Sequence, residues 1–188
     1  MHGAFYALAR LMAVLGGIVL SVLIVMTCLS VLGRGLNTLA HSGLLGGLGA
    51  MLAGFGPVPG DFELVEAGMA FAVFAFLPLC QMRAAHASVD LFTNALGRGA
   101  NRWIVAFWEV VFALVMVLIV WRLYFGLLGK VANGETTFLL QFPVWWAYAA
   151  SFAAGVMAAA VAVYAAVQRV ISALTRHEIL PGGGGAGH

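Results

Sequence analysis

Charged residues inside long apolar stretches are the side chains of this sequence best placed to do chemistry. Glu109 and Arg122 lie within one such stretch, and Glu63 and Glu66 begin another. An ionisable group in a bilayer is costly, so it is a candidate for binding or moving an ion. Two interpretations of Glu109 are therefore open: a structural partner for an arginine, or a site for a proton or a cation.

The other charges lie near the ends of the apolar stretches, where long side chains can reach the aqueous interface. Glu63 and Glu66 would also be stabilised by the dipole at the start of a helix. Glu66 and Arg122 are expected at similar depth, which suggests an ion pair between two helices. These charges are typical of helix anchoring rather than of a solute pathway.

A polar run over residues 81–90 is a second candidate for an interaction site. Arg83, His86 and Asp90 recur at intervals of three and four residues, so on a continuing helix they share one face. This face is expected to fix the connection to the next helix or to grip a partner subunit. A solvated loop is the competing interpretation. In the structural interpretation of Glu109, Arg83 or Arg102 is its expected partner.

Several chemistries lack the residues that they need. The chain has five histidines: His2, His41, His86, His177 and His188. None lies in the middle of an apolar stretch, which argues against a haem held by two axial histidines. We find no phosphate-binding glycine motif, no nucleophile–base set within the membrane and no basic cluster for nucleic acid. Cys28 and Cys80 lie in apolar runs, where a thiol behaves as a small hydrophobic group. We expect no enzyme, no cofactor, no metal site and no nucleic-acid partner.

The elements that position these residues are long and apolar. Of the 188 residues, 63% are hydrophobic and 9% are charged, whereas soluble domains have about 25% charged residues. A helix needs about 20 apolar residues to cross a hydrocarbon core of about 30 Å. The stretches that meet this length are residues 11–33, 62–82, 103–128 and 143–168. The first is too long for the apolar region of a signal peptide, so we expect it to be retained.

We predict an all-α integral membrane protein with four transmembrane helices in one bundle, residues 1–176. A disordered glycine-rich tail, residues 177–188, would follow it. Within the third stretch, Trp103 and Trp121 are 18 positions apart, or about 27 Å along a helix. Tryptophan favours the membrane interfaces, so this spacing fits one crossing of the bilayer.

The basic residues of the loops predict the orientation. Six lie on one side: Arg10, Arg83, Arg98, Arg102, Arg169 and Arg176. Two lie on the other side: Arg34 and Lys130. We therefore expect both termini in the cytoplasm.

The segment over residues 36–60 is apolar but rich in glycine, and each glycine costs about 1 kcal/mol of helix propensity relative to alanine. Pro57 and Pro59 would end any helix there. A short helix in the outer interface, or a loop packed on a partner, is the favoured interpretation. A fifth transmembrane span is the competing one.

Two motifs carry a resemblance to a known family. In the first, Glu63 and Glu66 lead a helix that ends in Gln81-x-Arg83, followed by His86-x-x-Val89-Asp90. In the second, Gly134-Glu135-Thr136 leads into Phe142-Pro143-Val144-Trp145. Over about residues 5–176 the chain resembles the DctQ-type small membrane subunit of tripartite ATP-independent periplasmic (TRAP) transporters. The segment 36–60 departs from this pattern, because it is longer than the usual connection.

The resemblance implies a role in secondary active transport at the bacterial inner membrane. In this family a periplasmic solute-binding protein delivers an organic anion, often a carboxylate, to a large membrane subunit that a sodium gradient drives as a symporter. The small subunit would scaffold the large M subunit and help to dock the binding protein, with no substrate or sodium ligands of its own. The residues that we expect to hold the structure or contact a partner are Glu63, Glu66, Arg83, His86, Asp90, Glu109, Arg122, Glu135 and Trp145.

Two other functions stay open on the sequence. A small homo-oligomeric channel or exporter would use Glu109 as its coupling carboxylate. An accessory subunit of a membrane enzyme would need only the four helices and a partner.

Overall fold

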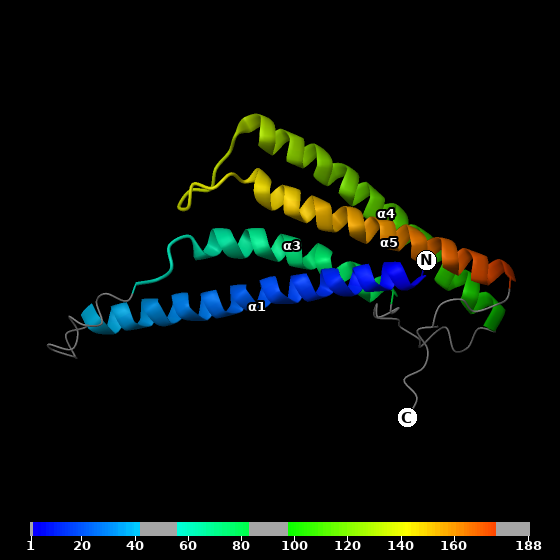
Figure 1. Ribbon diagram of the computed structural model, residues 1–188, viewed down its shortest axis with the longest axis horizontal. Helices are drawn as coiled ribbons and strands as arrows, with labels where there is room; N and C mark the ends of the chain where they lie inside the picture. Colours follow the sequence, from blue (N-terminus) through cyan, green and yellow to red (C-terminus); the bar gives the residue numbers. More distant parts are fainter. Residues whose placement is uncertain (1, 42–55, 83–97, 176–188) are drawn as a thin grey trace, which may run out of the picture.

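The computed structural model describes residues 2–41, 56–82 and 98–175, most of which form long helices (Figure 1). The helices are α1 (His2–His41), α3 (Asp61–Met82), α4 (Arg98–Asn133) and α5 (Trp145–Thr175). Each of the four is long and apolar enough to cross a membrane. The structure therefore confirms the predicted all-α class with four candidate membrane-spanning helices.

The helices are longer than the apolar stretches that predicted them. α1 has 40 residues and would be about 60 Å long, twice the thickness of a hydrocarbon core. It continues past residue 33 through Arg34 to His41, so residues 36–41 are its last turns rather than a separate interfacial helix. Residues 42–55 of that predicted segment and the tail 177–188 fall outside the described residues, and residues 56–60 are not helical.

α5 is the central helix of the bundle. It contacts α4 on one side and α3 on the other, while α1 packs mainly along α3 (Figure 1). Half of the most apolar 18-residue window of α5 is buried, compared with 11–17% in the other three helices. Most side chains of α1 and α4 are therefore exposed on the surface of the chain.

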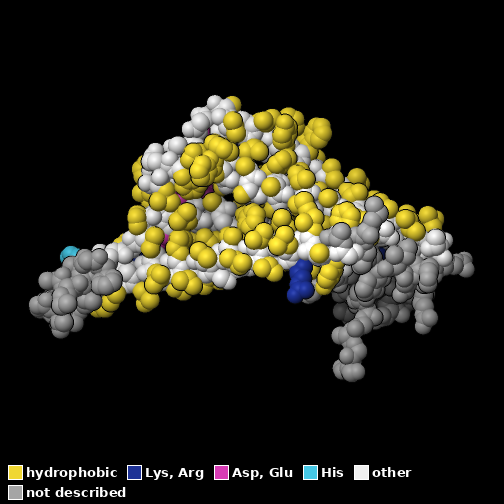
Figure 2. All heavy atoms as spheres, in the orientation of Figure 1, with side chains coloured by type: hydrophobic (Ala, Val, Ile, Leu, Met, Phe, Trp, Pro, Cys, Tyr) yellow, Lys and Arg dark blue, Asp and Glu magenta, His cyan; other side chains and the backbone are white. Residues whose placement is uncertain are grey.

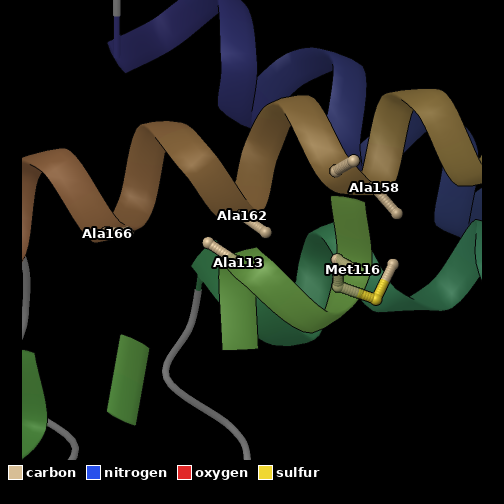
Figure 3. Packing of buried hydrophobic residues seen from close by; sticks show 6 residues of the cluster. Ala113, Met116, Ala158, Ala162 and Ala166 are labelled. Carbon is tan, nitrogen blue, oxygen red and sulfur yellow. The ribbon is translucent and has the colours of Figure 1, made fainter. Parts of the chain in front are cut away.

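Alanines form most of the contact between α4 and α5. Figure 3 shows Ala113 and Met116 of α4 beside the α5 alanines 158 and 162, and Ala166 follows one turn further along α5. Ala158 and Ala162 are at most 2% exposed. In lipid, helices associate through close packing rather than through the hydrophobic effect, so small side chains that let the backbones approach stabilise this pair.

Two glycines bring α1 and α3 together in the same way. A Cβ atom placed on Gly16 would lie 3.0 Å from the Cβ atom of Ala75, and one placed on Gly68 would lie 2.7 Å from Cδ1 of Leu23. A larger residue at Gly16 would require the helices to separate by a few tenths of an ångström, and one at Gly68 would require the Leu23 side chain to shift.

The outer surface is apolar over all four helices. Figure 2 shows hydrophobic side chains spread across most of the visible face, with few charges among them. The exposed residues include Val22, Leu32, Leu114 and Leu118, each about 60% exposed or more. A soluble monomer rarely shows apolar surface on this scale, so this surface fits contact with lipid and with other membrane-embedded helices.

Candidate functional site: polar contacts between the helices

Asp61 joins α1 to α3 at the end of the bundle where α3 begins. We call this end the hairpin end, because the hairpin that connects α4 to α5, described below, also lies there. Its Oδ2 accepts hydrogen bonds from Ser30 Oγ at 2.5 Å and from Arg34 Nη2 at 2.7 Å. Its Oδ1 accepts one from the backbone N–H of Phe62 at 2.9 Å. The Arg34 guanidinium also lies 5.1 Å from the centre of the Phe62 ring. Asp61 therefore has a structural role that was not predicted from the sequence.

The connection between α4 and α5 is a small hairpin over residues 134–144. An isolated antiparallel bridge pairs Thr136 with Pro143, and the N–H of Thr137 donates to the carbonyl of Phe142 at 2.9 Å. Gly134 (φ 62°) and Gln141 (φ 57°) have left-handed backbone conformations that turn the chain. The Gln141 side-chain amide donates to the carbonyl of Phe138 at 2.8 Å, which stabilises the tip.

Glu63 binds this hairpin to the start of α3. Its two carboxylate oxygens accept hydrogen bonds from the backbone N–H groups of Leu139 and Leu140, at 2.6 Å and 2.9 Å. Gly60 (φ 73°) lies directly against Leu140, because a Cβ atom on this glycine would be 2.4 Å from Leu140 Cγ. The glutamate that opens the family motif thus fixes a loop of the same chain.

Glu135 stabilises the other side of the hairpin. Its carboxylate accepts hydrogen bonds from Lys130 Nζ at 2.5 Å and from Asn133 Nδ2 at 3.0 Å. These donors, Lys130 first, hold the pKa of the Glu135 carboxyl below its ordinary value of 4.5. Both oxygens are engaged within the chain, so the Gly-Glu-Thr motif has a local structural role.

Glu109 connects three helices at the opposite end of the bundle. It accepts a hydrogen bond from the side-chain amide of Gln81 on α3, and its Oε1 lies 4.0 Å from Arg169 Nε on α5. The Glu109 and Arg169 side chains are only 12% and 13% exposed. In the described residues the basic partner of Glu109 is thus Arg169, and the expected pairing with Arg83 or Arg102 stays a prediction. Arg83 and the side chain of Arg102 fall outside what the structure describes.

The expected ion pair between Glu66 and Arg122 is not formed. Both side chains are exposed, and the ion pairs among the described residues are Arg34–Asp61, Lys130–Glu135 and Arg169–Glu109. The helix pairs in close contact are α1–α3, α3–α5 and α4–α5, so α3 and α4 approach each other little.

The remaining predicted residues divide into two groups. Trp145 begins α5 as expected, 38% exposed, with its ring 6.0 Å from that of Trp146. Arg83, His86 and Asp90 lie outside the described residues, so the predicted shared face stays a prediction.

Comparison with known proteins decides the family. The family described as "Tripartite ATP-independent periplasmic transporters, DctQ component" matches residues 23–172. The chain belongs to the DctQ family. It is thus a small membrane subunit of a TRAP transporter, which confirms the resemblance seen in the motifs. No curated protein and no solved structure matches this DctQ chain.

The first expected consequence for this DctQ chain concerns Asp61. Asp61→Ala removes three hydrogen bonds at the hairpin end of α1 and α3, whereas Ser30→Ala removes one of them. We expect Asp61→Ala to speed amide hydrogen exchange in residues 30–41 and to lower Tm, with a smaller change for Ser30→Ala. Equal, wild-type-like exchange in both variants would contradict this role.

The second consequence concerns pH. The folded pKa of Glu135 lies below the unfolded one, so its carboxylate contributes stability fully above about pH 4.5 and loses it as the pH falls through the lower folded pKa. We expect the difference in Tm between the wild type and Glu135→Gln to shrink as the pH is lowered from about 7 to about 3. A difference that does not change with pH would show that the carboxylate charge is not what stabilises the hairpin.

Proposed function

We propose that this chain is the static scaffold of a sodium-driven TRAP transporter that imports an organic anion. Carboxylates are the class of anion to test first. The observation that carries the proposal is that the polar side chains of this chain bond to one another between its own helices. Asp61 ties α1 to α3, Glu63 ties α3 to the hairpin, and Glu109 ties α4 to α3 and α5. These contacts hold the chain's own helices together, as a rigid support for a moving partner requires.

The exposed apolar faces support binding to the large M subunit. α1 and α4 present rows of large aliphatic side chains that no other described helix covers. Lipid or the helices of a membrane-embedded partner would cover such rows equally well. Family membership supports the large subunit as the partner.

The orientation is part of the proposal. The excess of basic residues on one side supports both termini in the cytoplasm and the chain in the inner membrane. The hairpin end would then face the periplasm, where the solute-binding protein arrives. Phe138 at the hairpin tip is 87% exposed and Leu139 is 59% exposed, so the tip has apolar surface for this docking.

The residues 81–90 complete the proposed interface. Arg83, His86 and Asp90 would grip the large subunit from the cytoplasmic side. Purification of an Asp90→Ala variant with less large subunit than the wild type would support this grip, and full retention would support a solvated loop.

The rival function, a channel that uses Glu109, finds little support in this geometry. A coupling carboxylate must exchange a proton or a cation with a pathway. Glu109 is instead largely buried against Gln81 and Arg169, on three helices of one chain.

Co-expression tests the proposal. A tagged chain should co-purify with the large subunit, and uptake of the anion that the binding protein retains should require both membrane subunits, the binding protein and a sodium gradient. Uptake by proteoliposomes that contain this chain alone would contradict the proposal.

A further inference from the structure

A cavity of about 430 Å³ lies at the hairpin end between α3, α4, α5 and the hairpin. This volume falls within the range of about 300–1,000 Å³ that is usual for small-molecule sites. Its lining is mostly apolar and includes Phe74, Leu123 and Phe142. Polar groups on this lining without a hydrogen-bond partner among the described residues include Thr137 Oγ1 of the hairpin and two groups on the helices.

The first is the carboxylate of Glu66. Glu63, one turn earlier, is bonded to the backbone of the hairpin. Glu66 lines the cavity and makes no hydrogen bond or ion pair with any residue that the structure describes. A carboxylate about 7.5 Å along α3 from its first residue lies near the lipid headgroups or below them. At this depth a cation that donates hydrogen bonds would stabilise it.

The second is the hydroxyl of Ser151 on α5. Ser151 is 3% exposed, lines the same cavity, and its Oγ has no hydrogen-bond partner in the part of the chain that the structure describes. Other helical hydroxyls of this chain donate to the carbonyl four residues earlier, as Ser21, Thr27, Ser172 and Thr175 do. Ser151 is thus a buried polar group that a bound molecule would satisfy.

The two groups lie at successive depths. α3 and α5 both run away from the hairpin, and a Cβ atom on Gly155 would lie 3.7 Å from the Phe74 ring. Counting back one turn places Ser151 level with Ala70, which is about 6 Å deeper than Glu66 along α3. From the hairpin inward, the cavity lining therefore offers an anion, then a hydroxyl, then the apolar side chains of Phe74 and Leu123.

We infer that this cavity binds a phospholipid with a primary ammonium headgroup. The ammonium donates to the Glu66 carboxylate, the Ser151 hydroxyl donates to an ester carbonyl below the headgroup, and an acyl chain packs on Phe74 and Leu123. The order of the groups in such a lipid matches the order in the cavity. The site lies within this chain, so it does not depend on how the large subunit binds.

Native mass spectrometry of the delipidated full chain tests the inference with three lipids that share the same acyl chains. Phosphatidylethanolamine should bind about tenfold more tightly than phosphatidylcholine or phosphatidylglycerol, because a charge-assisted hydrogen bond contributes affinity of that order. Glu66→Gln should remove the preference, and Glu66→Lys should shift it to phosphatidylglycerol. Ser151→Ala should weaken the binding of all three lipids alike.

Arg122→Gln is the matched control, since it neutralises an exposed charge on α4 that does not line the cavity. It should keep the preference for phosphatidylethanolamine. Equal binding of the three lipids by the wild type, or a preference that survives Glu66→Gln, would overturn the inference. So would release of the large subunit, rather than of lipid, from the Glu66→Gln complex, because Glu66 would then pair with a basic side chain of that subunit.

Discussion

Glu109→Ala is expected to lower the free energy of unfolding by about 3 kcal/mol, because it removes a carboxylate that pairs with the largely buried guanidinium of Arg169. The substitution also removes the acceptor of the Gln81 amide and so loosens α3, α4 and α5 together. Unfolding in a series of detergent mixtures, followed by tryptophan fluorescence, measures the change.

The double variant Glu109→Leu/Arg169→Leu separates a structural role from a functional one. Replacing both members of a buried ion pair by apolar residues is often neutral for stability. We therefore expect the double variant to regain most of the lost stability and to support normal anion uptake in the assembled transporter. Restored stability without uptake would contradict the structural role and return Glu109 to the transport pathway.

Ala162→Leu is the second substitution with a large expected effect. Ala162 is 0% exposed in the contact between α4 and α5, beside Ala113 (Figure 3). A leucine there must push the helices apart, and overpacking of this kind costs about 1–3 kcal/mol. We expect a cost at the upper end of that range, since Ala162 is fully buried and belongs to the same packed cluster as Ala113 and Met116 of α4.

Ala160→Leu is the matched control on the same helix. Ala160 is exposed, and alanine and leucine differ little in helix propensity. The control should unfold like the wild type. A loss of stability as large as that of Ala162→Leu would show that α5 tolerates no added volume on any face, and would refute the packing explanation.

The four candidate membrane-spanning helices among the described residues were predictable because hydrophobic length is a local property. Their ends were not, since the apolar stretch marks only the part that the hydrocarbon core must cover. Arg34 shows the difference: it ends the apolar stretch, yet α1 continues to His41 and uses Arg34 to bind Asp61. Asp61 was missed because its partners, Ser30 and Arg34, lie far back in the sequence on another helix.

The pairing errors have a second physical cause. Residue counting gives the depth of a side chain but not the direction in which its helix face points. Glu66 and Arg122 were assigned similar depths, yet α3 and α4 both pack on α5 rather than on each other. Glu63 was placed correctly at the start of α3, but its partners are backbone N–H groups, which leave no trace in side-chain types. The partner of Glu109 that the sequence offered was Gln81, which lies on the preceding helix, α3, and belongs to the Gln81-x-Arg83 motif.

Cross-linking α1 to α3 tests the static scaffold most directly. The Cβ positions of Gly16 and Ala75 are 3.0 Å apart, somewhat closer than the roughly 3.5–4.5 Å between the Cβ atoms of a disulfide, so a small separation of the two helices brings them into range. A Gly16→Cys/Ala75→Cys variant, with Cys28 and Cys80 replaced by serine, should therefore form a disulfide on oxidation. Anion uptake by the reconstituted transporter should be the same before and after oxidation, because the proposed static scaffold requires no movement of α1 relative to α3. Uptake that falls on oxidation and returns with a reductant would contradict the scaffold.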